Sequence, residues 1–157
     1  MTFYCFENAR TPGQVAEMRR LDAAGICLFC PDGLARHPPE RILLRTRHWT
    51  ALHNDFPYPG TRMHLLLVPR QHATDLTGLP GAAQQDFWHA LEAVVSDQEL
   101  TYYGLGVRNG DCRYTGASIA HVHAHLLVGE PGPGGPGPVR MRFSARPGGP
   151  AHPPDPA

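Results

Sequence analysis

The run from His121 to Val128 places the strongest constraint on the fold, because its residues alternate in character. The order His-Val-His-Ala-His-Leu-Leu-Val is typical of a β-strand, on which successive side chains point to opposite faces. The three histidines would then share one face, with neighbours about 6.6 Å apart and the outer pair about 13 Å apart. One metal ion could bind two of these imidazoles but hardly all three. Three imidazoles are also poor core material, so this face indicates a functional cleft.

The rest of the chain predicts both helices and strands. Thr11 and Pro12 suit the N-cap and first position of a helix that ends near Gly25. The apolar run 65–68 suits a strand buried on both faces, and the spacing of apolar residues over 87–95 predicts an amphipathic helix. We expect strands over 41–45, 49–53, 63–69, 102–107 and 119–128. This order predicts an α+β fold, an antiparallel sheet of about five strands with helices packed on it.

The length of 157 residues suits one domain. We expect this domain to span residues 1–145, with its core over 26–129. The proline- and glycine-rich run 130–138 should hold no regular element, and residues 139–144, which alternate apolar and basic, could add an edge strand. Residues 146–157 are predicted to be a disordered tail.

Charge and hydropathy exclude several classes of protein. Fourteen basic and fourteen acidic residues cancel, so the chain lacks the basic footprint of a nucleic-acid-binding domain. No apolar run approaches the roughly 18 residues that span a bilayer, and residues 1–10 do not resemble a secretory signal. We therefore expect a cytoplasmic protein that binds neither nucleic acid nor membrane. In that reducing compartment the four cysteines should be thiols or metal ligands rather than disulfides.

A short loop, Gly116-Ala117-Ser118, precedes the histidine strand. Glycine allows a ligand to approach the backbone closely, and successive amides of such a loop can form an anion-binding concavity. The Ser118 hydroxyl adds a donor for a phosphate oxygen. Taken alone the loop could be a simple turn, and His121 with His123 could equally form a bidentate zinc site.

Together, the segment 116–127 resembles the signature of the histidine triad family, in which a Gly-x-Ser/Thr loop precedes three alternating histidines. Weaker similarity extends over residues 26–129. It includes the knuckle Cys27-Leu28-Phe29-Cys30, the loop 54–60, and the segment His64-Leu65-Leu66-Leu67-Val68-Pro69-Arg70-Gln71-His72. The usual pattern has glycine directly before the histidine that corresponds to His64, whereas here residues 61–63 intervene, so the ribose-binding loop is longer or reshaped.

The resemblance implies that His123, the middle histidine, is the nucleophile. A neutral imidazole can attack the α-phosphorus near neutral pH, because the unperturbed pKa of histidine is about 6.5. His125 and a backbone carbonyl are candidates for fixing its tautomer, and Ser118 would stabilise charge on the phosphate. The catalytic set is therefore His123, His121, His125 and Ser118. The implied substrate-binding residues are Asn54, Asn109, Gly116, Ala117 and Ser118, with Asp55 as an alternative to Asn54.

The pair Cys27-x2-Cys30 has the spacing of half a tetrahedral zinc site, although one such pair is also compatible with two packed thiols or a redox pair. Similarity to the zinc-containing branch of the family implies His72 and His121 as the other ligands, with His64 as the alternative to His72. Four protein ligands fit a structural Zn²⁺ rather than a catalytic one.

The expected function is hydrolysis or transfer at the α-phosphate of a nucleotide conjugate. The resemblance implies phosphoramidates, acyl-nucleotides or dinucleoside polyphosphates as substrates, a homodimer, and hydrolysis rather than phosphorolysis on account of His125. Two alternatives remain: a zinc-stabilised nucleotide-binding regulatory module, and a metalloenzyme with His121 and His123 as catalytic zinc ligands.

Other notable residues carry weaker expectations. Aromatic residues that could stack on a nucleobase are Trp49, Phe56 and Tyr58. Histidines expected at the surface, in packing or in the tail are His37, His48, His53, His89 and His152. A solvated basic strip that a phosphate-rich substrate could use comprises Arg140, Arg142 and Arg146.

Overall fold

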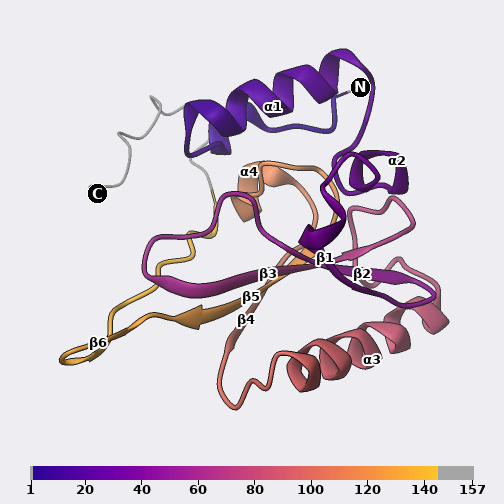
Figure 1. The fold of residues 1–157 in the computed structure, drawn as a ribbon. Helices are drawn as coiled ribbons and strands as arrows, with labels where there is room; N and C mark the ends of the chain where they lie inside the picture. Colours follow the sequence, from indigo (N-terminus) through magenta and orange to yellow (C-terminus); the bar gives the residue numbers. More distant parts are fainter. Residues whose placement is uncertain (1, 145–157) are drawn as a thin grey trace.

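The computed structural model describes residues 2–144, which form a five-stranded antiparallel sheet with helical segments on both faces (Figure 1). The strand order is β1-β2-β3-β5-β4, so β5 lies between β3 and β4. The strands are β1 (Ile42–Arg45), β2 (Trp49–His53), β3 (Thr61–Pro69), β4 (Gly104–Arg108) and β5 (His123–Gly129). The predicted α+β class and antiparallel sheet are confirmed.

The helix α3 (Gly81–Asp97) covers one face of the sheet. Its apolar side packs on β2, β3 and β5, where alternate residues point toward it, as the sequence periodicity predicts. The rings of Trp49 and Phe87 lie 5.0 Å apart, and the indole Nε1 donates to the carbonyl of Ala83 at 2.7 Å. This side of the sheet therefore forms an apolar core.

The opposite face carries the N-terminal segment and the histidines. Its helices are η1 (Phe6–Asn8), α1 (Pro12–Ala23), α2 (Pro31–Leu34) and η2 (Pro39–Arg41). Thr11 caps α1 as predicted, since its side chain accepts from the Gln14 amide and Pro12 opens the helix. A second apolar cluster, which includes Leu21, Leu52 and Leu66, fixes α1 to the sheet.

The last strand begins later than predicted. β5 starts at His123, so the expected strand over 119–122 is wrong. The backbone there bonds elsewhere: Ile119 bridges to Tyr4, the Ala120 amide donates to Phe3, and the Val122 amide donates to Ala73. The three triad histidines therefore do not form one straight row, and His121 is free to turn toward a different site.

Two other expectations were also wrong. Residues 139–144 add no strand to the edge of the sheet, because they cross its face instead. The run 130–138 holds a short exposed hairpin, β6 (Pro131–Gly132) and β7 (Gly135–Pro136). One helical turn, α4 (Cys112–Thr115), lies between β4 and β5. The predicted tail, with Arg146 and His152, lies outside the described residues.

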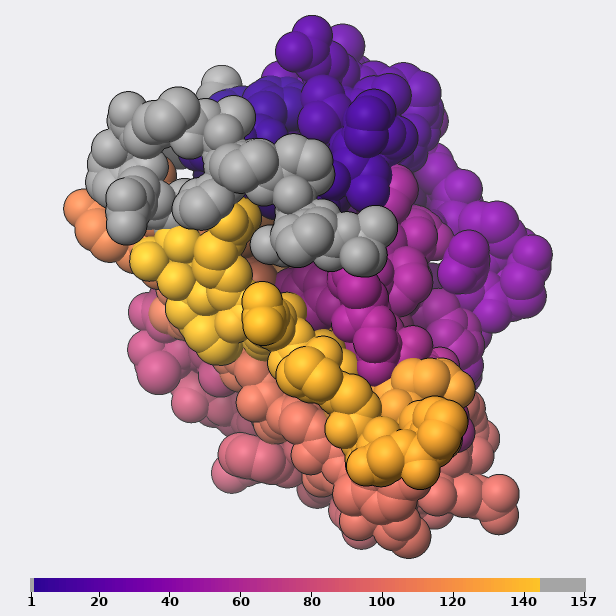
Figure 2. Space-filling model, turned by 90° about the vertical axis from the view of Figure 1, so that its left-hand side faces the viewer, coloured from indigo at the N-terminus to yellow at the C-terminus, as the bar shows by residue number. Residues whose placement is uncertain are grey.

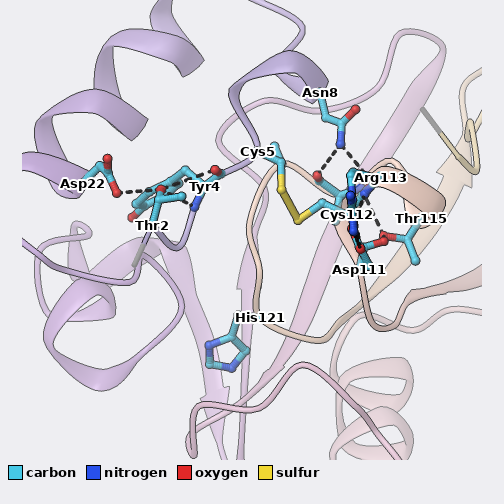
Figure 3. Close-up of a disulfide and its surroundings, with 12 residues drawn as sticks. Thr2, Tyr4, Cys5, Asn8, Asp22, Asp111, Cys112, Arg113, Thr115 and His121 are labelled. Atoms are coloured by element: carbon cyan, nitrogen blue, oxygen red, sulfur yellow. Dashed lines mark hydrogen bonds and ion pairs between the residues drawn. A yellow bond between two sulfur atoms is a disulfide. The ribbon is translucent and has the colours of Figure 1, made fainter. Parts of the chain in front are cut away.

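A disulfide joins Cys5 to Cys112, which corrects the expectation that all four cysteines are thiols or metal ligands (Figure 3). Their Cα atoms lie 6.3 Å apart although the residues are 107 positions apart in sequence. Asn8, three residues after Cys5, donates from Nδ2 to the carbonyls of Cys112 and Ala117 at 3.1 and 2.7 Å. The N-terminal segment is thus fastened to the loop before β5.

No helix within residues 2–144 is long and apolar enough to cross a membrane.

Candidate functional site

A cavity opens on the histidine-bearing face of the sheet, between the N-terminal segment and the ends of β4 and β5. The residues that line it include two triad histidines, His123 and His125, together with Gly116, Ser118 and Arg108. Arg108 pairs with His123 across the two strands, and Gly106 pairs with His125. Directly opposed residues project from the same face, so the arginine lies beside the predicted nucleophile.

His123 is held as a neutral imidazole with a defined tautomer. Its Nδ1 lies 2.6 Å from the backbone carbonyl of His121. A carbonyl can only accept, so Nδ1 carries the proton and the Nε2 lone pair remains available. Burial lowers the pKa of His123 to about 4, despite the opposing effect of this hydrogen bond. The arrangement suits a nucleophile that is unprotonated at neutral pH.

A hydrogen bond with His64 determines which nitrogen of His125 carries the proton. The Tyr58 amide donates to Nδ1 of His64 at 3.0 Å, which leaves the proton of His64 on Nε2. That atom lies 2.7 Å from Nδ1 of His125, which must accept. His125 therefore carries its proton on Nε2, a buried atom without a partner among the described residues. Burial lowers the pKa of both rings, that of His64 to about 3, so both stay neutral.

The predicted anion-binding loop reaches the same cavity. Gly116 ends α4 with φ +68°, a left-handed conformation that favours glycine. Ser118 Oγ accepts a hydrogen bond from Nε2 of Gln14 at 3.0 Å, so its hydroxyl hydrogen can be donated to a ligand. Gly116 and Ser118 line the cavity, whereas Ala117 is buried beneath them with 3% exposure.

The three expected polar contacts lie in different places. Asn54 lines the cavity, but its Oδ1 accepts from the Phe56 amide and its Nδ2 lies 3.1 Å from His64. Asp55 also lines it and is paired with His37 at 3.1 Å. Asn109 is not among the described residues that line the cavity. Its amide bonds the 75–76 turn, accepting from the Leu76 amide at 2.6 Å.

Several residues of the site were not predicted from sequence. His64 was considered only as a metal ligand, and Gln14 only as part of a helix; neither residue has a local motif that places it beside the triad. Arg108 stands next to the predicted Asn109 but carried no signal of its own. Its burial, at 6% exposure, is visible only in the fold.

His121 belongs to a separate cluster of four candidate metal ligands. The ligand atoms of Cys27, Cys30, His72 and His121 all lie within 4.8 Å of one another. His64 is not in this group and bonds His125 instead, and His123 does not join it either. Within the described part of the chain, the structure thus brings together the predicted set and not the two alternatives.

The donor geometry of this cluster fits a tetrahedral metal. Nδ1 of His121 lies 3.4 Å from Cys27 Sγ and 3.7 Å from Cys30 Sγ, and Nδ1 of His72 lies 3.4 Å from Cys30 Sγ. Tetrahedral zinc, with bonds of about 2.3 Å to sulfur and 2.0–2.1 Å to nitrogen, separates sulfur from nitrogen by about 3.5 Å.

Hydrogen bonding prepares His121 for this role. Its Nε2 donates to the carbonyl of Pro69 at 2.9 Å, which leaves the Nδ1 lone pair directed at the cysteines. Burial raises the pKa of the Cys30 thiol to about 12 and also raises that of Cys27. The buried thiol of Cys27 and the half-buried thiol of Cys30 are therefore costly to ionise without a cation.

Comparison with known proteins places the chain. A protein-family profile described as HIT domain matches residues 35–132, more than half of the chain. No curated protein matches significantly. Among solved structures, a HIT family hydrolase from Clostridium thermocellum has 25% identity and a TM-score of 0.54, over 66% of this chain and 90% of its own.

Two further structures share the fold. A hypothetical protein from Leishmania major has 21% identity and a TM-score of 0.55, over 78% of this chain and 85% of its own. A Zn-bound histidine triad family protein from Mycobacterium smegmatis has 18% identity and a TM-score of 0.52, over 68% and 77%. Given the sheet, His123 and His125 at its cavity and the matched profile, the chain belongs to the HIT domain family.

Proposed function

We propose that the protein is a hydrolase or transferase that acts at the α-phosphate of a nucleotide conjugate through a nucleotidyl intermediate on His123. The observation that carries this proposal is the hydrogen bond from His123 Nδ1 to the His121 carbonyl at 2.6 Å. It leaves an unprotonated Nε2 on a residue that lines a cavity together with Gly116 and Ser118. The name of the Clostridium thermocellum neighbour, a HIT family hydrolase, supports the reaction class.

The chemistry follows from the placement of protons. The Nε2 lone pair of His123 forms a bond to phosphorus, and the leaving group departs with the electrons of its own bond. The Nδ1 proton stays in the hydrogen bond to the His121 carbonyl throughout. Water then attacks phosphorus and releases a proton to the solvent, the P–N bond breaks, and its electron pair returns to Nε2.

Donors around the cavity would stabilise the phosphate. The Ser118 hydroxyl, with Gln14 bonded behind it, can donate to a phosphate oxygen. The buried Nε2–H of His125, fixed by His64, is a second oriented donor. Such preorganised donors act on the charge that develops in the transition state. Asn54 and Asp55 line the same cavity, and we infer that they contact the nucleoside part.

Cys27, Cys30, His72 and His121 would hold a structural Zn²⁺. When bound, the ion would supply cross-linking of three chain segments rather than Lewis-acid chemistry, because four protein ligands leave no open position. Its position would support the carbonyl of His121 that orients His123.

Intact-protein mass spectrometry tests the proposal. The full chain would be incubated briefly with adenosine 5′-phosphoramidate or guanosine 5′-phosphoramidate, as wild type, as His123→Ala, and as the exposed control His89→Ala. We expect a nucleoside monophosphate adduct on wild type and control only, mapped to His123. Nucleotide binding without an adduct or turnover would instead indicate a binding module.

A further inference from the structure

The segment 139–144, here called the C-terminal strap, lies across the site face of the sheet. Figure 2 shows it in yellow as a band over the molecular surface. It is packed directly on glycines: a Cβ at Gly106 would lie 2.6 Å from Met141 Sδ, and one at Gly116 would lie 3.0 Å from the carbonyl oxygen of Arg142. The strap follows the region that matches the family profile, which ends at residue 132.

Beneath the strap lies Arg108, a buried guanidinium. It donates to the carbonyls of Thr115 and Arg142, the latter at 2.7 Å, and to the Tyr58 hydroxyl at 2.8 Å. All of these acceptors are neutral, and no carboxylate of residues 2–144 lies within 4.0 Å of it. A buried charge with neutral partners alone is costly, so this position favours an anion in the adjoining cavity.

Three more arginines line the same cavity, namely Arg10 and two residues of the strap. Arg140 and Arg142 of the strap line it with Arg108 and His123. The carboxylates that line the cavity are already engaged, since Glu17 pairs with Arg20 at 2.6 Å and Asp55 with His37 at 3.1 Å. Neither strap arginine has a carboxylate within ion-pair distance in the described chain. The carboxylates that line the cavity therefore do not neutralise the charge of these arginines.

We propose that Arg108, Arg140 and Arg142 form an anion subsite that binds a second phosphate, the leaving group of the substrate. This inference rests on the proposed function and narrows its substrate class to nucleotides joined through a phosphoanhydride bond. His123 Nε2 bonds to the α-phosphorus, the bridging P–O bond breaks, and the departing phosphate takes the electron pair as an anion. Phosphate leaves without collecting a proton, whereas an amine must be protonated, and the guanidinium groups neutralise the departing charge.

Binding measurements test the subsite without any turnover. Calorimetry would compare the affinities of AMP and ADP, with inorganic pyrophosphate as a third probe, for the full chain. The test variant is Arg140→Gln/Arg142→Gln, and the matched control is Arg19→Gln/Arg36→Gln, which removes two exposed charges outside the cavity. We expect wild type and control to bind ADP about tenfold more tightly than AMP, and the test variant to lose that preference.

A kinetic arm uses the ratio of kcat/KM for diadenosine triphosphate to that for adenosine 5′-phosphoramidate. This ratio should fall about tenfold in Arg140→Gln/Arg142→Gln and stay unchanged in the control. Arg108→Lys should retain most of the preference and Arg108→Met should lose it; if Arg108→Met does not fold, the strap variant decides.

The two proposals fail in different ways. Equal affinities for AMP and ADP in wild type, or a preference that survives in the strap variant, would overturn the subsite even if the His123 adduct forms. An ADP preference that the strap variant abolishes, without adduct or turnover in wild type, would support the subsite and refute the catalytic proposal.

Discussion

His64 Nε2 lies 2.7 Å from His125 Nδ1, and the proton between them belongs to His64. The Tyr58 amide donates to Nδ1 of His64, so this one backbone group fixes which nitrogen carries the proton in both His64 and His125. Its end is the Nε2–H of His125, which has no acceptor among the residues described. An unsatisfied buried donor at the edge of a cavity is expected where a ligand supplies the acceptor.

Replacing His64 with leucine should therefore lower kcat about tenfold and leave the zinc content unchanged. Leucine keeps the volume of the site but cannot hold the tautomer of His125, so the donor to the phosphate would be lost for part of the time. Single-turnover kinetics with a nucleoside phosphoramidate would measure this, with the exposed His89→Leu as control. A kcat equal to wild type would show that His125 needs no such orientation.

The sequence predicted most of the site that depends on local pattern. The alternating run 121–128 indicated the position of His123, and the spacing of Cys27 and Cys30 indicated half of the metal cluster. It put His121 on the same face as His123, because a strand pattern alone does not reveal that residues 118–120 bond to the N-terminal segment and Val122 to Ala73, instead of to β3. Tertiary contacts, which a local pattern does not show, decide whether such a segment continues the strand or leaves it.

The metal cluster makes its own prediction. Purified protein should contain about one zinc per chain, and a strong chelator should lower the Tm by about 10 °C, since the ion binds the folded state. His72→Ala should lose the zinc, whereas His64→Ala should keep it, because His64 lies outside the cluster. Elemental analysis and thermal melting would check both. Zinc retained by His72→Ala would rule out the proposed ligand set.

Long-range contacts explain what could not be predicted. Cys5 and Cys112 are 107 positions apart, and Gln14 and Ser118 are 104 positions apart. No periodicity or spacing relates such residues, because their contact depends on how the N-terminal segment packs over the sheet. The expectation of four unpaired cysteines followed from the presumed compartment rather than from any feature of the residues themselves.

The disulfide should contribute substantially to stability. Removing it with Cys5→Ser/Cys112→Ser should lower the free energy of unfolding by about 2–4 kcal/mol, because the bond closes a long loop in the unfolded chain. Urea denaturation of both proteins would measure this difference. Under reducing conditions wild type should match the variant. Equal stability of the two under oxidising conditions would contradict the prediction.

The ion pair of Asp55 should make stability depend on pH. The hydrogen bond from His37, followed by the charges of His37 and Arg41, holds the pKa of Asp55 below its ordinary value despite partial burial. A carboxyl with a depressed folded pKa stabilises the fold above its unfolded pKa of about 3.9, and this contribution is lost as pH falls through the folded value.

Asp55→Asn should accordingly be less stable than wild type at pH 6, and the difference should be smaller at pH 3. Urea denaturation at both values would test this, with Asp97→Asn as an exposed control. A difference that stays constant over this range would show that Asp55 contributes through its shape rather than its charge.

Gln14 provides a last test, because it brings α1, which precedes the matched family region, to the proposed phosphate site. Its Nε2 donates to Ser118 Oγ at 3.0 Å and so directs the hydroxyl hydrogen toward the cavity. Gln14→Ala frees the hydroxyl to rotate, and the loss of one oriented donor should weaken AMP binding several-fold and lower kcat/KM by about tenfold. The matched control is Gln85→Ala, an exposed glutamine on α3. If calorimetry and steady-state kinetics gave the same values for both variants, Ser118 would not depend on α1, and the phosphate site would be confined to the loop before β5.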